Sequence, residues 1–339
     1  MSTYEQNPGA APVESTPAPI PYKDRSTGLT VFGILTILLG GLAGLFVPLL
    51  LVGQALSAKT TGAPATLSTI LPTIFVYGIL AVALVWLGVG SIMARRWARA
   101  LLLIFSWSWL IVGVLVSVFM GIVMPKMLAN LPASGTTNRP AMPSAAIAGM
   151  MVGMFLVLGV IFVVLPAIWT FFYHSRHVKA TCETRDPVTR WTDACPLPVL
   201  GFCLWLAFSV PTMLITPLTG HAVIPFFGIF LTNVPGTMLY LAIAALWSYA
   251  AWSLYKLKRL GWWLILISWC LFVTSAFLTF ARHDLMEMYR LMGYPKEQIE
   301  QMQKSSLLIG SSMTWLMRLT LLPFLGYLLF IRRYLRRET

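Results

Sequence analysis

The chain has 339 residues, of which 58% are apolar and only 10% are charged, and its mean hydropathy is +0.79. Soluble domains have about 25% charged residues and about 45–50% apolar ones. This composition excludes a soluble enzyme, a disordered protein and a disulfide-stapled secreted domain. The formal net charge is +13. The basic residues stand in short clusters between apolar segments, which excludes a nucleic-acid partner and suits a membrane surface that carries anionic lipid.

Apolar segments of twenty or more residues follow one another along most of the chain, and such segments are typical of membrane-spanning helices. They follow a tail, residues 1–27, that is rich in Pro, Ala, Ser and Thr and is predicted to be disordered. We predict an all-α polytopic transmembrane bundle with about eight spans: 28–54, 68–94, 98–123, 145–173, 197–218, 223–254, 260–281 and 306–331. Because the sixth span contains Pro225, Pro235 and Gly236, we expect it to be kinked or to begin with a re-entrant segment. Nine spans are the alternative.

The basic residues divide unequally between the two sides of the membrane that these spans define. Sixteen Lys and Arg fall on one side and seven on the other, with Arg318 inside a span. Because cytoplasmic loops are enriched in Lys and Arg, we predict that both termini are cytoplasmic and that the protein lies in the cell (inner) membrane. An odd number of spans would separate the termini and reduce this asymmetry, which favours eight.

The two halves of the sequence resemble each other. Residues 83–107 align with residues 245–269, and each stretch is an apolar segment, a short basic turn and a second apolar segment. We therefore predict two parallel four-helix repeats, 28–178 and 197–339, joined by a cytoplasmic linker, 179–196. Repeats with the same orientation are related by an axis along the membrane normal. Such a duplication fits a carrier with a site between its halves, or a bundle duplicated to bury more helix surface.

Pairs of glycines four residues apart occur in two predicted spans. Gly40 and Gly44 form one pair, and Gly149 and Gly153 form the other. Small residues at this spacing allow two helices to approach closely in a membrane. We expect the partner to be another helix of this chain, and the alternative is a second copy of the chain in a homo-oligomer.

The segment 174–196 collects four residues that could bind a metal. His174, His177, Cys182 and Cys195 are ligand types that bind Zn²⁺ tetrahedrally. No CxxC motif fixes their geometry, and the alternative is a set of surface histidines beside reduced thiols. A nucleophilic Cys182 with His177 as its base ranks lower, because no third group orients the base.

Arg318 is the single charged residue near the middle of a predicted span. A guanidinium at the bilayer centre costs about 2.5–3.5 kcal/mol, and no acidic residue in any span can pair with it. Three arrangements remain: the side chain reaches the membrane surface, carbonyls and hydroxyls of the bundle hold it, or it faces a wet cavity that admits an anion. Ser311 and Ser312 lie one to two turns away and complete this candidate ligand-binding site.

The predicted spans contain no Asp, Glu or His, so proton relays and bis-histidine haem are not expected. The sequence also has no Walker A motif, and we expect no cofactor and no enzymatic activity. The leading hypothesis is an accessory, scaffold or lipid-binding membrane protein whose partners are membrane lipids, anionic lipid at the cytoplasmic face, and a membrane protein or a second copy. The alternative is a small-molecule or anion transporter that uses the interface between the repeats. An enzyme acting on lipid from the segment 174–196 ranks last.

Overall fold

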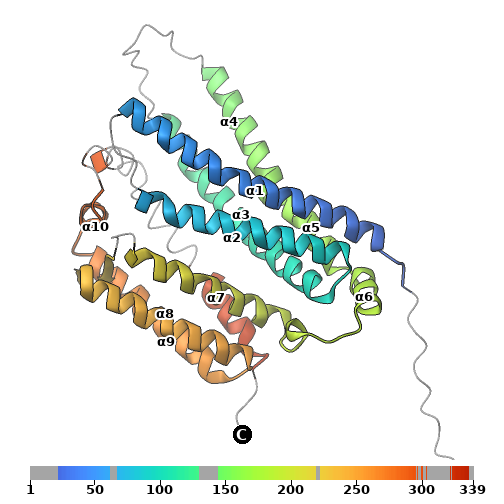
Figure 1. Ribbon diagram of the computed structural model, residues 1–339. Coiled ribbons are helices and arrows are strands. Elements are labelled where there is room, and N and C mark those ends of the chain that lie inside the picture. Colours follow the sequence, from blue (N-terminus) through green and yellow to red (C-terminus); the bar gives the residue numbers. More distant parts are fainter. Residues whose placement is uncertain are drawn as a thin grey trace, which may run out of the picture.

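The structure is a computed structural model, and it describes residues 22–61, 67–129, 144–218 and 222–294, together with 296, 299–300, 303, 321 and 323–335. Within these residues the chain is almost entirely helical (Figure 1). Seven helical segments of the described chain are long and apolar enough to cross a membrane. The prediction of an all-α polytopic membrane bundle is therefore confirmed.

The helices follow the order of the predicted spans, and basic turns or loops separate them. The elements of the first half are α1 (Ser26–Thr61), α2 (Leu67–Ile92), α3 (Arg96–Ala129), α4 (Ser144–Gly159), a π-helical segment (Val160–Val164), α5 (Leu165–His174) and α6 (Arg176–Arg185). Those that follow are a 3₁₀ turn (Trp191–Asp193), α7 (Leu197–Leu218), β1 (Ile224–Phe226), β2 (Ile229–Leu231), α8 (Asn233–Tyr255), α9 (Arg259–Phe280) and α10 (Leu285–Leu291). The π-helical segment joins α4 and α5 into one continuous span.

Two predictions fall largely outside the described residues. The eighth span, 306–331, is described mainly at its end, where Pro323–Arg332 is an apolar helix. Of the predicted tail, 1–27, only the last residues are described, and residues 22–25 precede α1 without regular secondary structure.

The predicted sixth span is wrong in its first part. We expected a kink or a re-entrant segment from residue 223, but β1 and β2 pair there as an antiparallel hairpin, and the helix α8 begins only after it. The two turn residues, Phe227 and Gly228, have positive φ values of 43° and 98°, which is the backbone geometry of a tight two-residue hairpin. Pro225 lacks the amide hydrogen that a helix would use. Local backbone chemistry thus outweighs the apolar composition of this segment.

Hydroxyl groups of α9 hold the hairpin in place. The Ser275 hydroxyl donates to the carbonyl of Pro225 (2.9 Å) and accepts from the amide of Phe227 (2.9 Å). The Thr279 hydroxyl accepts from the amide of Gly228 (3.0 Å). Ser275 and Thr279 are both buried. The backbone groups of the turn are therefore satisfied by side chains of α9 that lie 48 to 51 residues later in the chain.

The buried apolar side chains form two clusters, and each draws on one half of the chain. The first is centred on Tyr173, whose hydroxyl lies 2.7 Å from that of Ser91, and the Ser91 hydroxyl also donates to the carbonyl of Leu29. The second includes Trp262, whose indole nitrogen donates to the carbonyl of Leu328 at 2.8 Å. The division into two four-helix units and their origin as a repeat stay predictions.

The two basic turns that suggested the repeat have the same backbone structure. Ala94 and Leu257 both have positive φ, 51° and 60°. The amide after each donates to a carbonyl five residues earlier, from Arg95 to Gly90 (2.9 Å) and from Lys258 to Ser253 (3.0 Å), which is a common way for a helix to end. The alignment of residues 83–107 with residues 245–269 pairs Ser91 with Ser253, whereas these hydrogen bonds pair Gly90 with Ser253. The structural correspondence at this turn is therefore shifted by one residue relative to the sequence alignment.

One of the two glycine pairs lies in a close helix contact within the chain, as expected. A Cβ atom on Gly40 would lie 3.0 Å from the Ala81 carbonyl oxygen of α2, so α1 and α2 approach backbone to backbone. Cβ atoms on Gly149 and Gly153 would have no described atom within 4 Å. The second pair therefore has no partner helix in the described part of the chain.

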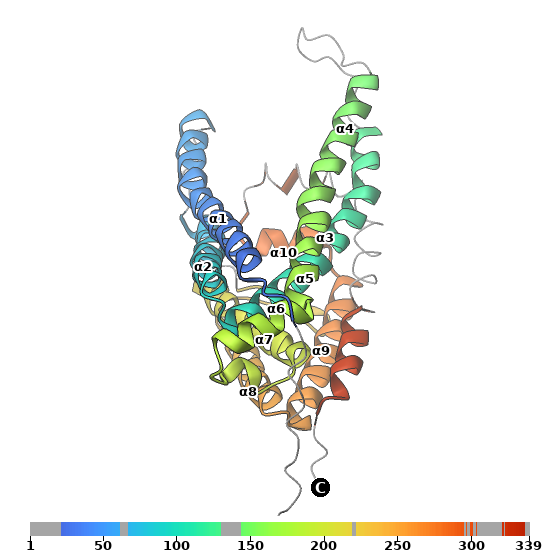
Figure 2. The same ribbon diagram turned by 90° about the vertical axis from the view of Figure 1, so that its right-hand side faces the viewer.

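The described basic clusters lie at one end of the bundle, which we name the basic end. It carries the turns between α2 and α3 and between α8 and α9, together with α6 and the end of the helix Pro323–Arg332 (Figure 1). The opposite end carries the β-hairpin and α10, and we name it the hairpin end. At the basic end Phe32 of α1 stacks on Phe172 of α5 at 4.1 Å, whereas toward the hairpin end α1 and α4 diverge (Figure 2). That the basic end faces the cytoplasm stays a prediction.

Candidate functional site

The segment after α5 folds back across the start of α3 and is fixed there by one buried acid. Asp186 is 2% exposed and follows the last residue of α6. Its carboxylate accepts a hydrogen bond from the amide of Arg96 (3.3 Å) and lies 3.6 Å from the Arg95 guanidinium and 3.4 Å from that of Arg190. The first turn of a helix has free amide groups and a partial positive charge. Because α3 has no acid in its own first turn, Asp186 supplies the capping charge.

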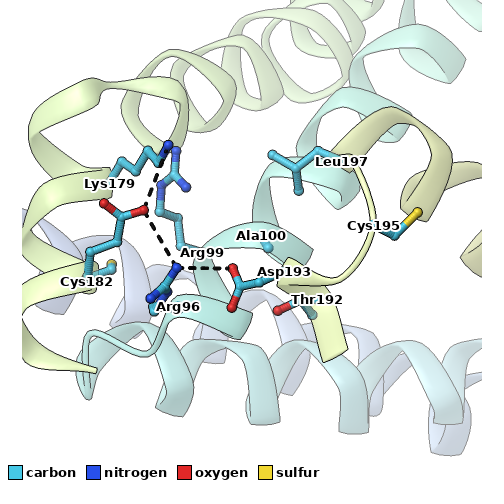
Figure 3. Close-up of a pocket in the computed structure, with 10 residues that line it drawn as sticks. Arg96, Arg99, Ala100, Lys179, Cys182, Thr192, Asp193, Cys195 and Leu197 are labelled. Carbon is cyan, nitrogen blue, oxygen red and sulfur yellow. Dashed lines mark ion pairs between the residues drawn. The ribbon is translucent and has the colours of Figure 1, made fainter. Parts of the chain in front are cut away.

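A chain of ion pairs crosses the surface next to this cap. Lys179 and Arg96 both lie 3.8 Å from the Glu183 carboxylate, and Arg96 also lies 3.5 Å from the Asp193 carboxylate (Figure 3). Asp193 in turn accepts from the amide of Arg190 at 3.0 Å, which fixes the 3₁₀ turn. Glu183 and Asp193 thus offset the positive charges of two residues, Lys179 of α6 and Arg96 of α3.

A pocket of about 270 Å³ lies between α3, α6 and the 3₁₀ turn. Its lining consists of Arg96, Arg99, Ala100, Lys179, Cys182, Glu183, Thr192, Asp193, Cys195 and Leu197. Arg99 follows Arg96 by three residues and lies on the same face of α3. No described acid forms an ion pair with Arg99, and Figure 3 shows it beside the ion-pair chain without a link to it. The lining therefore contains one positive charge that no neighbour offsets through an ion pair.

Two polar atoms of the pocket lining are buried and have no hydrogen-bond partner among the described residues. They are the Nε of Arg99 and the hydroxyl of Thr192, a residue that is 2% exposed. A buried polar group without a partner costs about 1–3 kcal/mol. A ligand with several acceptor oxygens could bind to both groups, and an anion would also offset the charge of Arg99.

Apolar contacts close the pocket toward the middle of the bundle. Ala100 and Leu197 are part of its lining, and one turn further along their helices lie Ile104 of α3 and Gly201 of α7. A Cβ atom on Gly201 would lie 3.2 Å from the Ile104 side chain, so these helices are in direct contact. At this contact, apolar atoms of α3 and α7 close off the polar lining of the pocket.

The four residues predicted to bind zinc are not brought together. Cys182 and Cys195 line the pocket, but the Nδ1 of His177 accepts from the amide of Lys23 (3.3 Å) and His174 is exposed. No group of three or more His, Cys, Asp or Glu in the described chain could hold a metal. Burial raises the pKa of each of the two thiols to about 11, which disfavours the thiolate form that binds zinc.

The other predicted site residues, Arg318, Ser311 and Ser312, lie outside the described residues. Arg99, Thr192 and Asp186 are not among the predicted site residues. A basic residue at the end of a span indicates orientation, and Thr192 and Asp186 belong to no motif. The spacing of Arg96 and Arg99 was the available signal, since it places two guanidinium groups on one helix face.

The fold and the pocket define a polytopic helical membrane protein with a charged pocket at one end of its bundle. Comparison of the chain with protein-family models, with curated proteins and with solved structures finds no match.

Proposed function

We propose that the protein is a non-catalytic membrane protein that binds anionic lipid at its basic end, in an accessory or scaffold role, and that this end faces the cytoplasm. The observation that carries the proposal is the turn between α8 and α9. Its cations Lys256, Lys258 and Arg259 form no ion pair with any described residue, whereas each described acid of the basic end has an ion pair. Each basic residue near anionic lipid contributes about 1 kcal/mol to membrane binding.

Aromatic side chains around this turn support the same proposal. Trp252 and Trp263 are 52% and 48% exposed, and Lys258 lies 5.9 Å from the Trp252 ring centre. Exposed tryptophans are typical of the boundary between the hydrocarbon and the headgroups. The unpaired cations are therefore at the depth where lipid phosphates lie.

The apolar contact between α3 and α7 favours lipid binding over transport. An anion transporter that used the interface between the halves would need polar groups along its path. The contact of Ile104 with Gly201 instead places apolar atoms one helical turn beyond the pocket lining.

The test is tryptophan quenching by brominated lipid in reconstituted protein. Brominated phosphatidylglycerol is expected to quench more strongly than brominated phosphatidylcholine, and the excess should decrease when salt screens the exposed cations. Replacing Lys256, Lys258 and Arg259 by Gln should reduce the excess, while Arg290→Gln in α10 at the hairpin end should not. Equal quenching by the two lipids would overturn the proposal.

A further inference from the structure

We propose that the pocket between α3, α6 and the 3₁₀ turn is a specific binding site for one phosphate group, either of a lipid headgroup or of a free phosphate compound. If the phosphate belongs to a lipid headgroup, the inference rests on the function proposed above, because it assigns one defined site to the general attraction of the basic end for anionic lipid. If the phosphate belongs to a free compound, the inference does not depend on the proposed function.

The charge of the pocket fits a single anionic group. Arg96 and Lys179 have acid partners in Glu183 and Asp193, so the charge left for a ligand is that of Arg99. The two cysteines are neutral because burial raises the pKa of their thiols to about 11, and they do not repel an anion. One guanidinium without an ion pair in a pocket of about 270 Å³ matches one small, oxygen-rich anion.

The missing hydrogen bonds specify where the oxygens of that anion would lie. The Arg99 Nε–H and the Thr192 hydroxyl are both buried and both without a partner in the described chain, and they come from two different elements of the lining, α3 and the 3₁₀ turn. Both can donate to oxygen. A phosphate that accepts from both would bridge the first half of the chain to the segment that enters α7, and would remove the cost of two unsatisfied groups.

The depth of the pocket favours phosphate over other anions. Arg96 is the first residue of α3 and the first of its candidate membrane span, so the pocket lies at the boundary between hydrocarbon and headgroups. Phosphate is the anion that the membrane itself supplies at this level. Arginine binds phosphate oxygens through charge-assisted hydrogen bonds of defined geometry.

The experiment measures the thermal unfolding of the full chain in mild detergent while a ligand is added. Inorganic phosphate and dioctanoyl phosphatidic acid are titrated separately, against sodium chloride of equal ionic strength and against dioctanoyl phosphatidylcholine. A ligand that binds the folded state raises Tm in a saturable way. We expect such a rise with phosphatidic acid if a lipid headgroup is the source, and with inorganic phosphate as well if free phosphate suffices.

The variants separate the pocket from general charge. Arg99→Gln should weaken the apparent affinity about tenfold or more, because a charge-assisted hydrogen bond is lost. Thr192→Val keeps the shape of the side chain and should weaken it several-fold, and Arg99→Lys should not restore it because the planar donor group is missing. Lys258→Gln, at the other basic turn, should leave it unchanged.

The outcomes also distinguish this inference from the proposed function. If neither compound raises the Tm of the unmodified protein in a saturable way, the phosphate site does not exist, even if brominated phosphatidylglycerol still quenches preferentially. If the rise persists in both Arg99→Gln and Thr192→Val, the anion binds elsewhere and the assignment is overturned. If inorganic phosphate binds and both variants abolish it while the lipid preference is absent, the site stands and the proposed function fails.

Discussion

The carboxylate of Asp186 accepts a hydrogen bond from the backbone amide of Arg96 at 3.3 Å, across 90 positions of the sequence. This contact caps α3 and ties to it the whole segment that follows α6. Since Arg95 and Arg190 also surround the same carboxylate, one buried acid sets the position of both walls of the pocket.

Replacement of Asp186 by Ala should therefore destabilise the fold. Loss of a helix cap costs about 0.5–2 kcal/mol, and we expect the Tm measured by tryptophan fluorescence to fall by about 2–4 °C. Asp284→Ala is the control, because Asp284 is exposed and its side chain does not cap α10. An equal effect of the two substitutions would show that the Asp186 contact contributes nothing of its own.

The close approach of α1 and α2 leads to a second prediction. A Cβ atom on Gly33 would lie 2.8 Å from the Gly88 carbonyl oxygen and 2.6 Å from the Ile92 side chain, whereas one on Gly41 would have nothing within 4 Å. Gly33→Ala should lower Tm because α2 has to move. Gly41→Ala should leave Tm unchanged or raise it, since Ala is the better helix former. A stable Gly33→Ala variant would contradict this packing of α1 on α2.

The two buried thiols of the pocket predict slow alkylation. The experiment uses a variant in which Cys203 and Cys270 are replaced by Ala. At pH 8 the folded variant should react with iodoacetamide about 100-fold more slowly than a thiol at the ordinary pKa. The reason is that the thiolate is the nucleophile and burial raises the pKa of both Cys182 and Cys195 to about 11. The rate should rise about tenfold per pH unit up to about pH 10. Fast labelling at pH 8 would show that the thiols are accessible and ionised, and the denatured protein gives the reference rate.

The same shift predicts how stability depends on pH. The folded state holds these thiol protons more tightly than the unfolded state, whose thiols have a pKa near 9.0. The thiols therefore favour folding fully below about pH 9, and this contribution is lost as the pH rises from about 9 to about 11. Tm should fall less steeply over this range in a variant with Ala at positions 182 and 195. An identical fall in both proteins would exclude the thiols as its cause.

The docking of the hairpin on α9 can be tested by hydrogen exchange. Ser275→Ala removes the hydroxyl that bonds to Pro225 and Phe227, so amides of residues 224–231 should exchange faster while the helices keep their protection. Ser268→Ala is the matched control on the same helix, because its hydroxyl bonds only to the Ile265 carbonyl of α9 itself. Unchanged exchange in Ser275→Ala would mean that strand pairing alone holds the hairpin.

The proposed orientation, with the basic end in the cytoplasm, predicts which end a reagent reaches. Single cysteines at Val188, 60% exposed at the basic end, and at Arg290, exposed in α10 at the hairpin end, are placed in a background without native cysteines. An impermeant maleimide added to intact cells should label only position 290. Labelling at 188 under these conditions would reverse the orientation.

The sequence by itself determined the class of the protein and the approximate positions of its first seven spans. Length and hydropathy of a segment are local properties, and the bilayer requires them of each helix separately. The clustering of basic residues at the ends of spans was predictable for the same reason, since charges are costly in the middle of a span.

The tertiary structure decided where backbone geometry or distant partners outweigh composition. Residues 224–231 are apolar, yet their turn residues and the hydroxyls of α9 make them a hairpin. The pocket depends on α3 meeting α6 and the 3₁₀ turn, whose residues in the lining follow those of α3 by about 80 to 100 positions. The sequence placed His177 and Cys182 in one metal site, but folding turned Cys182 toward Arg99 and His177 toward Lys23. Which charges are paired is a property of side chains that meet only in the folded chain. For this reason, the spacing of Arg96 and Arg99 in the sequence could not show that Arg99 lacks an acid partner.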